Sequence, residues 1–120
     1  DGPVNLSFTP LLAPMSRGIL ATLTAKLTGS SEVYQAFVDF YRDKEFVQVL
    51  PKGQQPHTAS VHGSNYVQLQ VKVDEHSNRV VVTGALDNLV KGAAGQAVQN
   101  ANLMFGLDET AGLKMQGVAP

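Results

Sequence analysis

The side chains that most often carry catalysis are few in this chain, and they are scattered. The 120 residues include no cysteine, so a thiol nucleophile, a disulfide and a thiolate zinc site are all excluded within the chain. The three histidines, His57, His62 and His76, have no Asp or Glu at metal-ligand spacing, which favours solvated loop side chains over a metal centre. The serines at 30, 31 and 60 lack a nucleophile-elbow motif and are typical of caps and turns. We therefore predict neither a catalytic residue nor a metal site.

Arg17 is the residue best suited to contact a substrate. It is the only arginine in the first forty residues, and it follows Pro10 and Pro14, whose rings stiffen the preceding loop. A guanidinium held by a stiff loop can bind a carboxylate or a phosphate through two parallel hydrogen bonds. A salt bridge or a snorkelling arginine explains the same position equally well, so the residues alone leave both interpretations open.

A run of small residues near the C-terminus is a second candidate contact site. Gly92-Ala-Ala-Gly-Gln-Ala97 lies within a helical pattern, where each of its two glycines costs about 1 kcal/mol relative to alanine. Small side chains let another backbone or a ligand approach closely. The run resembles a phosphate loop only superficially, because it lacks the GxGxxG spacing and sits within the helix rather than ahead of it. Close helix packing is therefore favoured over ligand contact.

The elements that must position these residues follow from hydrophobic spacing, because period two predicts strands and a spacing of three or four predicts helices. The pattern predicts strands over residues 4–9, 19–27, 46–50, 66–73 and 79–86, and helices over residues 31–43 and from Asp87 or Asn88 to Phe105. Gly106 suits the left-handed position that ends the last helix. Residues 52–65 are predicted to form a polar loop, and residues 113–118 are a candidate for a further strand or an extended docking segment.

The strands at 66–73 and 79–86 flank a turn-forming cluster and are predicted to pair as an antiparallel hairpin. The β-branched run 80–83 favours a central strand that is covered on both faces, whereas the alternation over 19–27 favours a half-buried strand. The order β-β-α-β-β-β-α predicts an α+β fold with helices packed on a mostly antiparallel or mixed sheet.

Length and charge limit the classes of function. A chain of 120 residues suits one domain, and a formal net charge of −1 gives no electrostatic footprint for nucleic acid or an anionic membrane. No apolar run approaches the ~20 residues that a membrane span needs, and the N-terminus has no signal-peptide layout. We therefore expect a cytoplasmic protein with neither a nucleic-acid nor a membrane partner. Because the chain begins at Asp1 without Met, we expect a piece of something longer.

Several segments resemble one enzyme family in that family's order. They are the proline-rich segment from Phe8 to Thr22, the Gly-Ser-Asn-Tyr at 63–66, the segment from Asp87 to Gly106, and the Asp-Glu-Thr-Ala-Gly-Leu at 108–113. They are similar to the C-terminal part of N-acetyl-γ-glutamyl-phosphate reductase, an NADP-dependent oxidoreductase of arginine biosynthesis. A shorter Asp-Asn-Leu-x-Lys-Gly-Ala-Ala stretch also occurs in aspartate-semialdehyde dehydrogenases, but the first two segments favour the reductase.

The resemblance implies a fold and a reaction. The fold is that of the C-terminal domain of the glyceraldehyde-3-phosphate and semialdehyde dehydrogenase type. In the reaction, NADPH reduces an acyl phosphate to a semialdehyde through a thioester on a cysteine. The family's cysteine, its His-x-Pro-Glu-type histidine and its NADP-binding Rossmann domain all precede the matched region. Residues 1–120 would therefore be a C-terminal substrate and oligomerisation domain with the last helix of the enzyme, inactive alone.

The resemblance also assigns roles to individual residues. Asn88 matches the position that reaches the nicotinamide end of the cofactor, and Gly92, one turn further on, would allow close approach. Arg17 is a weaker assignment as a contact for the substrate anion. The expected partners are the missing Rossmann domain, which would pack on the small residues 92–97, and further copies of the chain. The copies would associate through the sheet face that carries four polar residues, Thr22, Thr24, Gln68 and Gln70. The alternatives are a free-standing oligomerisation or binding module and a piece of an aspartate-semialdehyde-dehydrogenase-like enzyme.

Overall fold

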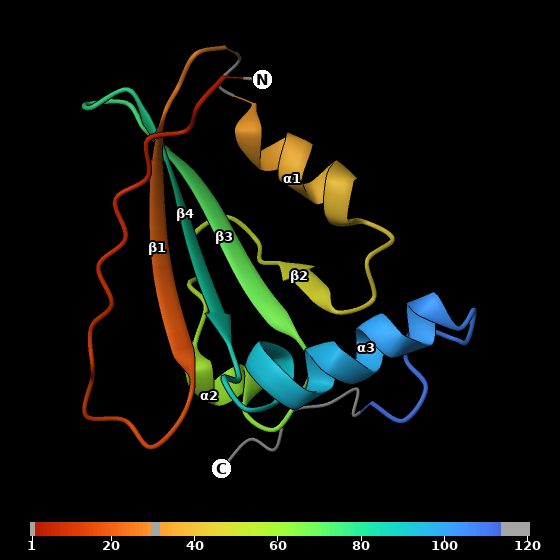
Figure 1. Ribbon diagram of the computed structural model, residues 1–120. Helices are drawn as coiled ribbons and strands as arrows, with labels where there is room; N and C mark the ends of the chain where they lie inside the picture. The colour runs from red at the N-terminus through yellow and green to blue at the C-terminus, as the bar shows by residue number, and fades with distance from the viewer. Residues whose placement is uncertain (1, 30–31, 114–120) are drawn as a thin grey trace.

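The computed structural model describes residues 2–29 and 32–113 of the chain. Its strands are β1 (Ile19–Lys26), β2 (Val47–Val49), β3 (Val67–Asp74) and β4 (Arg79–Leu86). Within the described residues they form a four-stranded sheet with the order β1-β4-β3-β2 (Figure 1). β4 is antiparallel to both β1 and β3, whereas β2 is parallel to β3. The mixed sheet confirms the predicted α+β class, the hairpin and the central place of β4.

The helices lie against this sheet and at one end of it. α1 (Val33–Tyr41) contacts β2 and β3, and it carries an aromatic pair whose Phe37 and Tyr41 ring centroids are 5.9 Å apart. The last helical segment begins as a π-helix, η1 (Val90–Ala94), and continues as α3 (Gly95–Met104). The sequence predicted one uninterrupted helix here, and its spacing does not reveal the wider first turn. Gly106 has a φ of +67°, which confirms the predicted left-handed end.

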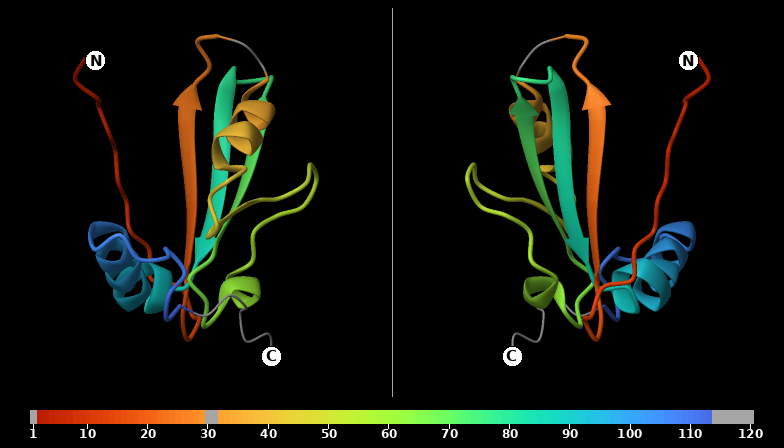
Figure 2. Two further views of the ribbon diagram at one scale, coloured as in Figure 1. Left: turned by 90° about the vertical axis from the view of Figure 1, so that its right-hand side faces the viewer. Right: turned by 90° about the vertical axis from the view of Figure 1, so that its left-hand side faces the viewer.

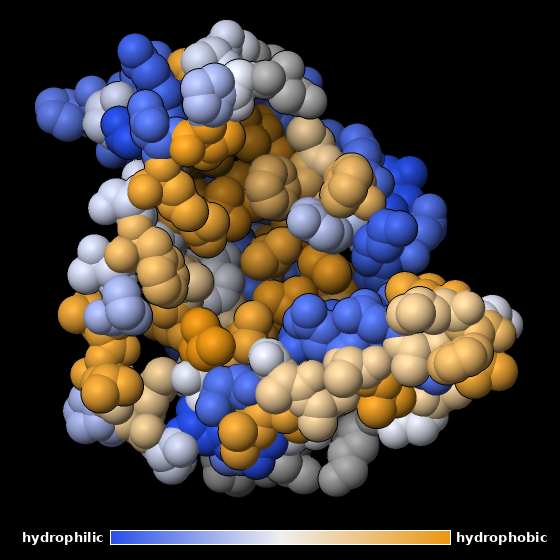
Figure 3. Space-filling model, viewed as in Figure 1, coloured by the Kyte–Doolittle hydropathy of each residue, from blue (hydrophilic) through white to orange (hydrophobic). Residues whose placement is uncertain are grey.

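The register places the polar and apolar residues of the strands on opposite faces. Gln70 lies opposite Thr83, and Val71 lies opposite Val82, so like residues meet on each face. Figure 3 shows apolar side chains gathered over the strands between α1 and α3. β1 was predicted to be half-buried, but Ile19 and Leu23 are 44% and 56% exposed. Within the described residues β1 pairs with β4 alone, and no helix packs extensively on either of its faces. The central run 80–83 is half-buried rather than fully covered.

The segment between β2 and β3 covers part of the polar face. It contains a short helix, α2 (Thr58–Val61), which lies inside the predicted loop and was not foreseen. Before α2, the carbonyls of Leu50 and Pro51 accept hydrogen bonds from Gln70 Nε2 at 3.3 and 2.7 Å. Gln70 is consequently only 4% exposed and cannot contribute to a subunit interface as expected. Thr22 and Thr24 remain exposed on the same face.

The N-terminal segment differs from its prediction. Residues 4–9 form no strand, and Val4 and Phe8 are 86% and 81% exposed. Figure 2 shows this segment diverging from the sheet toward the N-terminus. A strand needs a partner for its backbone groups, and within the described residues these residues have none, so alternation alone does not make a strand. Most of the candidate segment 113–118 lies outside the described residues.

The buried residues are concentrated at the end of the sheet where the last helix begins. Phe46, Val61, Val71 and Ala85 are the buried apolar side chains of the described residues. The buried polar ones are Ser64, Asn65, Gln70, Asp87 and Asn102. Buried polar groups need hydrogen-bond partners, and three of these five residues lie in segments that meet at the start of the last helix.

Candidate functional site at the start of the last helix

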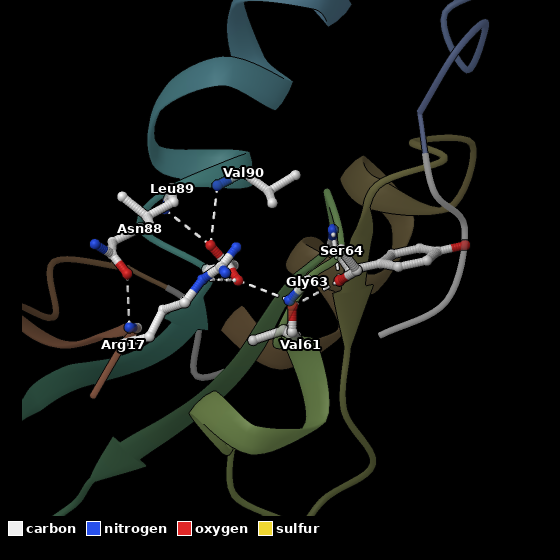
Figure 4. Close-up of polar contacts among 10 residues, drawn as sticks. Arg17, Val61, Gly63, Ser64, Asn88, Leu89 and Val90 are labelled. Carbon is white, nitrogen blue, oxygen red and sulfur yellow. Dashed lines mark hydrogen bonds and ion pairs between the residues drawn. The ribbon is translucent and has the colours of Figure 1, made fainter. Parts of the chain in front are cut away.

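Asp87 joins three segments that are far apart in the sequence. Its Oδ1 accepts hydrogen bonds from the backbone N–H groups of Leu89 and Val90, at 2.8 and 2.9 Å, and so caps the last helix. Its Oδ2 accepts the Gly63 N–H at 2.7 Å and forms an ion pair with Arg17 Nε, also at 2.7 Å (Figure 4). The carboxylate is fully buried, and both of its oxygens are used.

The protonation equilibrium of Asp87 reflects these contacts. Burial alone would raise the pKa of this carboxyl, but the backbone N–H groups of Gly63, Val90 and Leu89, together with the Arg17 guanidinium, lower it to about 2. The group is therefore a carboxylate at neutral pH, and it remains charged in a buried place because three backbone N–H groups and the Arg17 cation surround it.

Arg17 and Gly18 connect the loop before β1 to the same centre. The Gly18 N–H donates to Asn88 Oδ1 at 2.7 Å, so the residues that follow Arg17 and Asp87 in the sequence are also hydrogen-bonded to each other. Gly18 has a φ of +113°, and an added Cβ would lie 2.8 Å from Thr58 Cβ. Glycine is required here for both the backbone conformation and the contact with α2.

The Gly-Ser-Asn-Tyr turn supplies the third side of the site. The Ser64 hydroxyl donates to the Val61 carbonyl at 2.8 Å, which holds the turn against α2. Asn65 is fully buried, and its Nδ2 donates to Gln99 Oε1 at 2.8 Å. Asn65 Oδ1 has no hydrogen-bond partner among the described residues. Tyr66 packs edge-on against Phe46, with ring centroids 5.7 Å apart.

The two glycines of the small-residue run have different surroundings. A Cβ at Gly95 would lie 2.4 Å from Asn65 Oδ1 and 2.8 Å from the Val90 carbonyl oxygen. Gly95 is therefore small because the turn at Asn65 and the π-helical turn both press on it. A Cβ at Gly92 would meet nothing closer than Leu86 Cδ1 at 3.4 Å, which is ordinary contact. Packing among the described residues explains Gly95 but not Gly92.

A polar network supports the helix behind the site. Gln99 Oε1 also accepts a hydrogen bond from Lys91 Nζ at 2.7 Å, and Gln99 Nε2 donates to Glu109 Oε1. Lys91 Nζ lies 5.5 Å from the centroid of the Phe46 ring. Burial lowers the pKa of Lys91, and the charge of Glu109 partly opposes that shift. The network fixes α3 against the turn at Asn65.

Beside Arg17 the surface is hollowed. The hollow has a volume of about 400 Å³ and is lined by Arg17, His62, Gly63, four residues of the last helix, and Gly112 and Leu113 of the segment that follows it. The Arg17 side chain is 27% exposed, although its Nε is buried against Asp87. Arg17 therefore forms part of the wall of the hollow.

Two negative findings apply to the described residues. No group of three or more His, Cys, Asp or Glu side chains could hold a metal ion there. The same part of the chain contains no helix that is both long and apolar enough to span a membrane.

The structure brings together all three residues singled out in the sequence. Arg17 and Asn88 belong to one hydrogen-bonded cluster, and Gly92 N–H donates to the Asp87 carbonyl at 2.9 Å. Asp87 was foreseen only as a helix cap, and its ion pair with Arg17 has no signal in the spacing. Asn65 and Gln99 were missed, because amide side chains give no pattern that distinguishes buried from exposed positions.

The first 88 residues match the family model described as "Semialdehyde dehydrogenase, dimerisation domain". The chain is 57% identical, over 98% of its length, to an N-acetyl-gamma-glutamyl-phosphate reductase of Paenarthrobacter aurescens, and covers 35% of that protein. It is 54% identical, over 99% of its length, to the enzyme of that name from Salinispora tropica, covering 36%. To the enzyme of that name from Geobacter metallireducens the chain is 52% identical over 94% of its length, and it covers 34% of that protein. The chain thus spans about a third of these relatives, and by the match over residues 1–88 it belongs to the semialdehyde dehydrogenase dimerisation-domain family.

Proposed function

We propose that the chain is the C-terminal part of an NADPH-dependent N-acetyl-γ-glutamyl-phosphate reductase. The observation that carries the proposal is the identity of 52–57% to reductases of this name over nearly the whole chain. The structure supports it, because three of the four segments that carry the resemblance meet at Asp87. The enzyme would act in the cytoplasm, in arginine biosynthesis, and would convert an acyl phosphate to a semialdehyde.

The side chains present indicate which parts of the reaction this chain would serve. The chain has no cysteine, so the thiol that would accept the acyl group would belong to the part of the enzyme outside these residues. The resemblance places the acid–base histidine and the Rossmann domain there as well. When bound, NADPH would supply the hydride. This chain would contribute contacts to the nicotinamide end of the cofactor, a cation for the substrate anion, and a surface for subunit association.

Asn88 and Gly92 fit the role of cofactor contacts. The Asn88 side-chain oxygen is occupied by the Gly18 N–H, while its Nδ2 has no hydrogen-bond partner among the described residues. The amide is thus held in one orientation and offers a donor. Gly92 is exposed, and a Cβ at this position would make only ordinary van der Waals contacts with the described residues. A second backbone or a ring can therefore approach the helix there.

Arg17 would bind the phosphate or the carboxylate of the substrate from the edge of the hollow. Its ion pair with Asp87 gives it a structural role as well, so the two interpretations of this residue are compatible. The guanidinium has five N–H donors, and the pairing through Nε leaves the terminal nitrogens for a bidentate contact.

The proposed partners use two different surfaces. The missing Rossmann domain would pack on the small, exposed side of the last helix, at Gly92, Ala93, Ala94 and Ala97. Copies of the chain would associate through the sheet, in keeping with the family's description as a dimerisation domain. On the polar face this association would use Thr22 and Thr24 of β1, since Gln70 is covered.

The test is kinetic and uses the full-length enzyme that carries this chain. NADPH oxidation should depend on the acyl phosphate and should exceed NADH oxidation, while residues 1–120 alone should show no turnover. Asn88→Asp keeps the oxygen that accepts from Gly18 and removes the free donor, so the KM for NADPH should rise. The matched control is Asn5→Ala, in the exposed N-terminal segment, which should leave that KM unchanged. An unchanged KM in Asn88→Asp would refute the cofactor contact.

A further inference from the structure

We infer that Asp87 is a positioning residue for the reaction: its buried carboxylate holds the Arg17 guanidinium in one orientation, with the terminal nitrogens directed to the hollow where the substrate anion binds. The inference rests on the proposed function, in which Arg17 contacts that anion. Neither the sequence pattern nor the comparisons assign Asp87 a part in binding.

The geometry of the ion pair between Arg17 and Asp87 is the first observation that supports this inference. Asp87 Oδ2 lies 2.7 Å from Arg17 Nε, and this nitrogen is buried. Nε has no hydrogen-bond partner among the described residues, so the contact is an ion pair. Because a guanidinium is planar and rigid, an ion pair that holds the buried Nε in place restricts where the terminal N–H groups can lie. Arg17 lines the hollow of about 400 Å³, and 27% of its side chain is exposed. Arg17 is thereby oriented before any ligand arrives, which lowers the entropy lost on binding.

The rigid placement of the Asp87 carboxylate is the second observation. Three backbone N–H groups hold the carboxylate, from Gly63 on one side and from Leu89 and Val90 on the other. An acceptor held at three points cannot follow a moving guanidinium, so Arg17 must adapt to it. Oδ1 accepts hydrogen bonds from the start of the last helix, whereas Oδ2 contacts Gly63 and Arg17. The two sets of contacts can therefore be changed separately.

This separation makes Asp87→Asn a selective variant. An asparagine retains an oxygen for the Leu89 and Val90 N–H groups, but its NH₂ group opposes the donors of Gly63 and Arg17. The start of the helix, and with it Asn88, should persist while Arg17 is released. In the full-length enzyme we expect the KM for the acyl phosphate to rise between about tenfold and a hundredfold. The KM for NADPH should stay within about twofold of wild type.

The matched control is Asp108→Asn. Asp108 also accepts a backbone N–H, from Thr110 at 2.8 Å, but it is exposed and pairs with no arginine among the described residues, so neither KM should change. A double variant tests whether Asp87 acts through Arg17: once Arg17→Ala has raised the substrate KM, adding Asp87→Asn should raise it no further. If Asp87→Asn does not fold, Arg17→Lys keeps a cation for Asp87 without the bidentate edge, and it should raise the same KM alone.

A second readout does not depend on activity. In the full-length enzyme, the Nε–H resonance of Arg17 should exchange slowly with water, and Asp87→Asn should make it exchange fast. An unaffected Arg17 resonance would overturn the inference, and so would a released arginine with an unchanged substrate KM, because Asp87 would then be structural only. A wild-type enzyme that does not reduce the acyl phosphate would instead refute the proposed function. The results with the Asp87 and Arg17 variants do not decide that question.

Discussion

The two glycines of the last helix provide a sharp test of why this segment is built from small residues. Both stand in helical backbone, where replacing glycine by alanine ordinarily stabilises by about 1 kcal/mol. At Gly95 the new methyl group would lie 2.4 Å from Asn65 Oδ1, 2.7 Å from Val90 Cγ1 and 2.8 Å from the Val90 carbonyl oxygen. At Gly92 the nearest atom is the flexible end of Leu86, at 3.4 Å. The same substitution should therefore have opposite effects at the two positions.

The magnitudes follow from the contacts. Overpacking a buried site costs about 1–3 kcal/mol, and moving Asn65 away would also weaken its hydrogen bond to Gln99, worth about 1 kcal/mol. After subtracting the helix-propensity gain of about 1 kcal/mol, Gly95→Ala should lower the free energy of unfolding by about 1–3 kcal/mol. Gly92→Ala has no such cost, and it should raise that free energy by about 0.5–1 kcal/mol.

Urea unfolding of the 120-residue chain, followed by circular dichroism, measures both values. The denaturant slope should be the same for the two variants, so that the midpoints report stability. In the full-length enzyme the stable Gly92→Ala variant should show a raised KM for NADPH or a weakened domain contact. If Gly95→Ala is as stable as wild type, the tight approach of Asn65 and the π-helical turn is refuted. If Gly92→Ala destabilises the isolated chain, Gly92 has an internal role and loses its value as evidence for an outside partner.

Three further outcomes are expected. The pKa of Asp87 is lowered from 3.8 to about 2, so its charge adds about 2 kcal/mol to the free energy of unfolding above pH 4. This contribution is lost as the pH falls from 3.8 to 2, and the acid unfolding curves of wild type and Asp87→Asn should converge over that range. Light scattering at ~100 μM should give a dimer or larger species, reduced to a monomer by Thr22→Arg on β1 but not by Thr28→Arg beyond it. In hydrogen exchange, amides 89–97 should open at low free energy in the isolated chain and become protected in the full enzyme, while β3 and β4 stay protected in both; equal, strong protection of 89–97 would show that the helix needs no further domain.

The sequence was sufficient for the elements whose stability is local or whose partner is adjacent. The hairpin of β3 and β4 has alternating residues on both strands and a turn between them, so the pattern determines both the elements and their pairing. The segment 4–9 has the same alternation but no partner within the described residues, and it forms no strand. The π-helical turn was invisible for a related reason. Gly95, which follows that turn, lies against Asn65, thirty residues earlier in the chain, and no local spacing reports such a contact.

The site shows the same division between local and distant causes. Asp87 could be predicted as a cap because capping involves neighbouring N–H groups, and the structure confirms that part. Its second oxygen pairs with Arg17, seventy residues earlier, and this pairing decides what Arg17 can do. An arginine on a stiff loop could equally have been a free anion receptor or a neutralised structural residue. The ion pair through Nε makes the two roles compatible, because Arg17 both neutralises the buried carboxylate and lines the hollow. Of the residues described, Asp87 is therefore the one whose chemistry joins the stability of the helix to the presentation of Arg17.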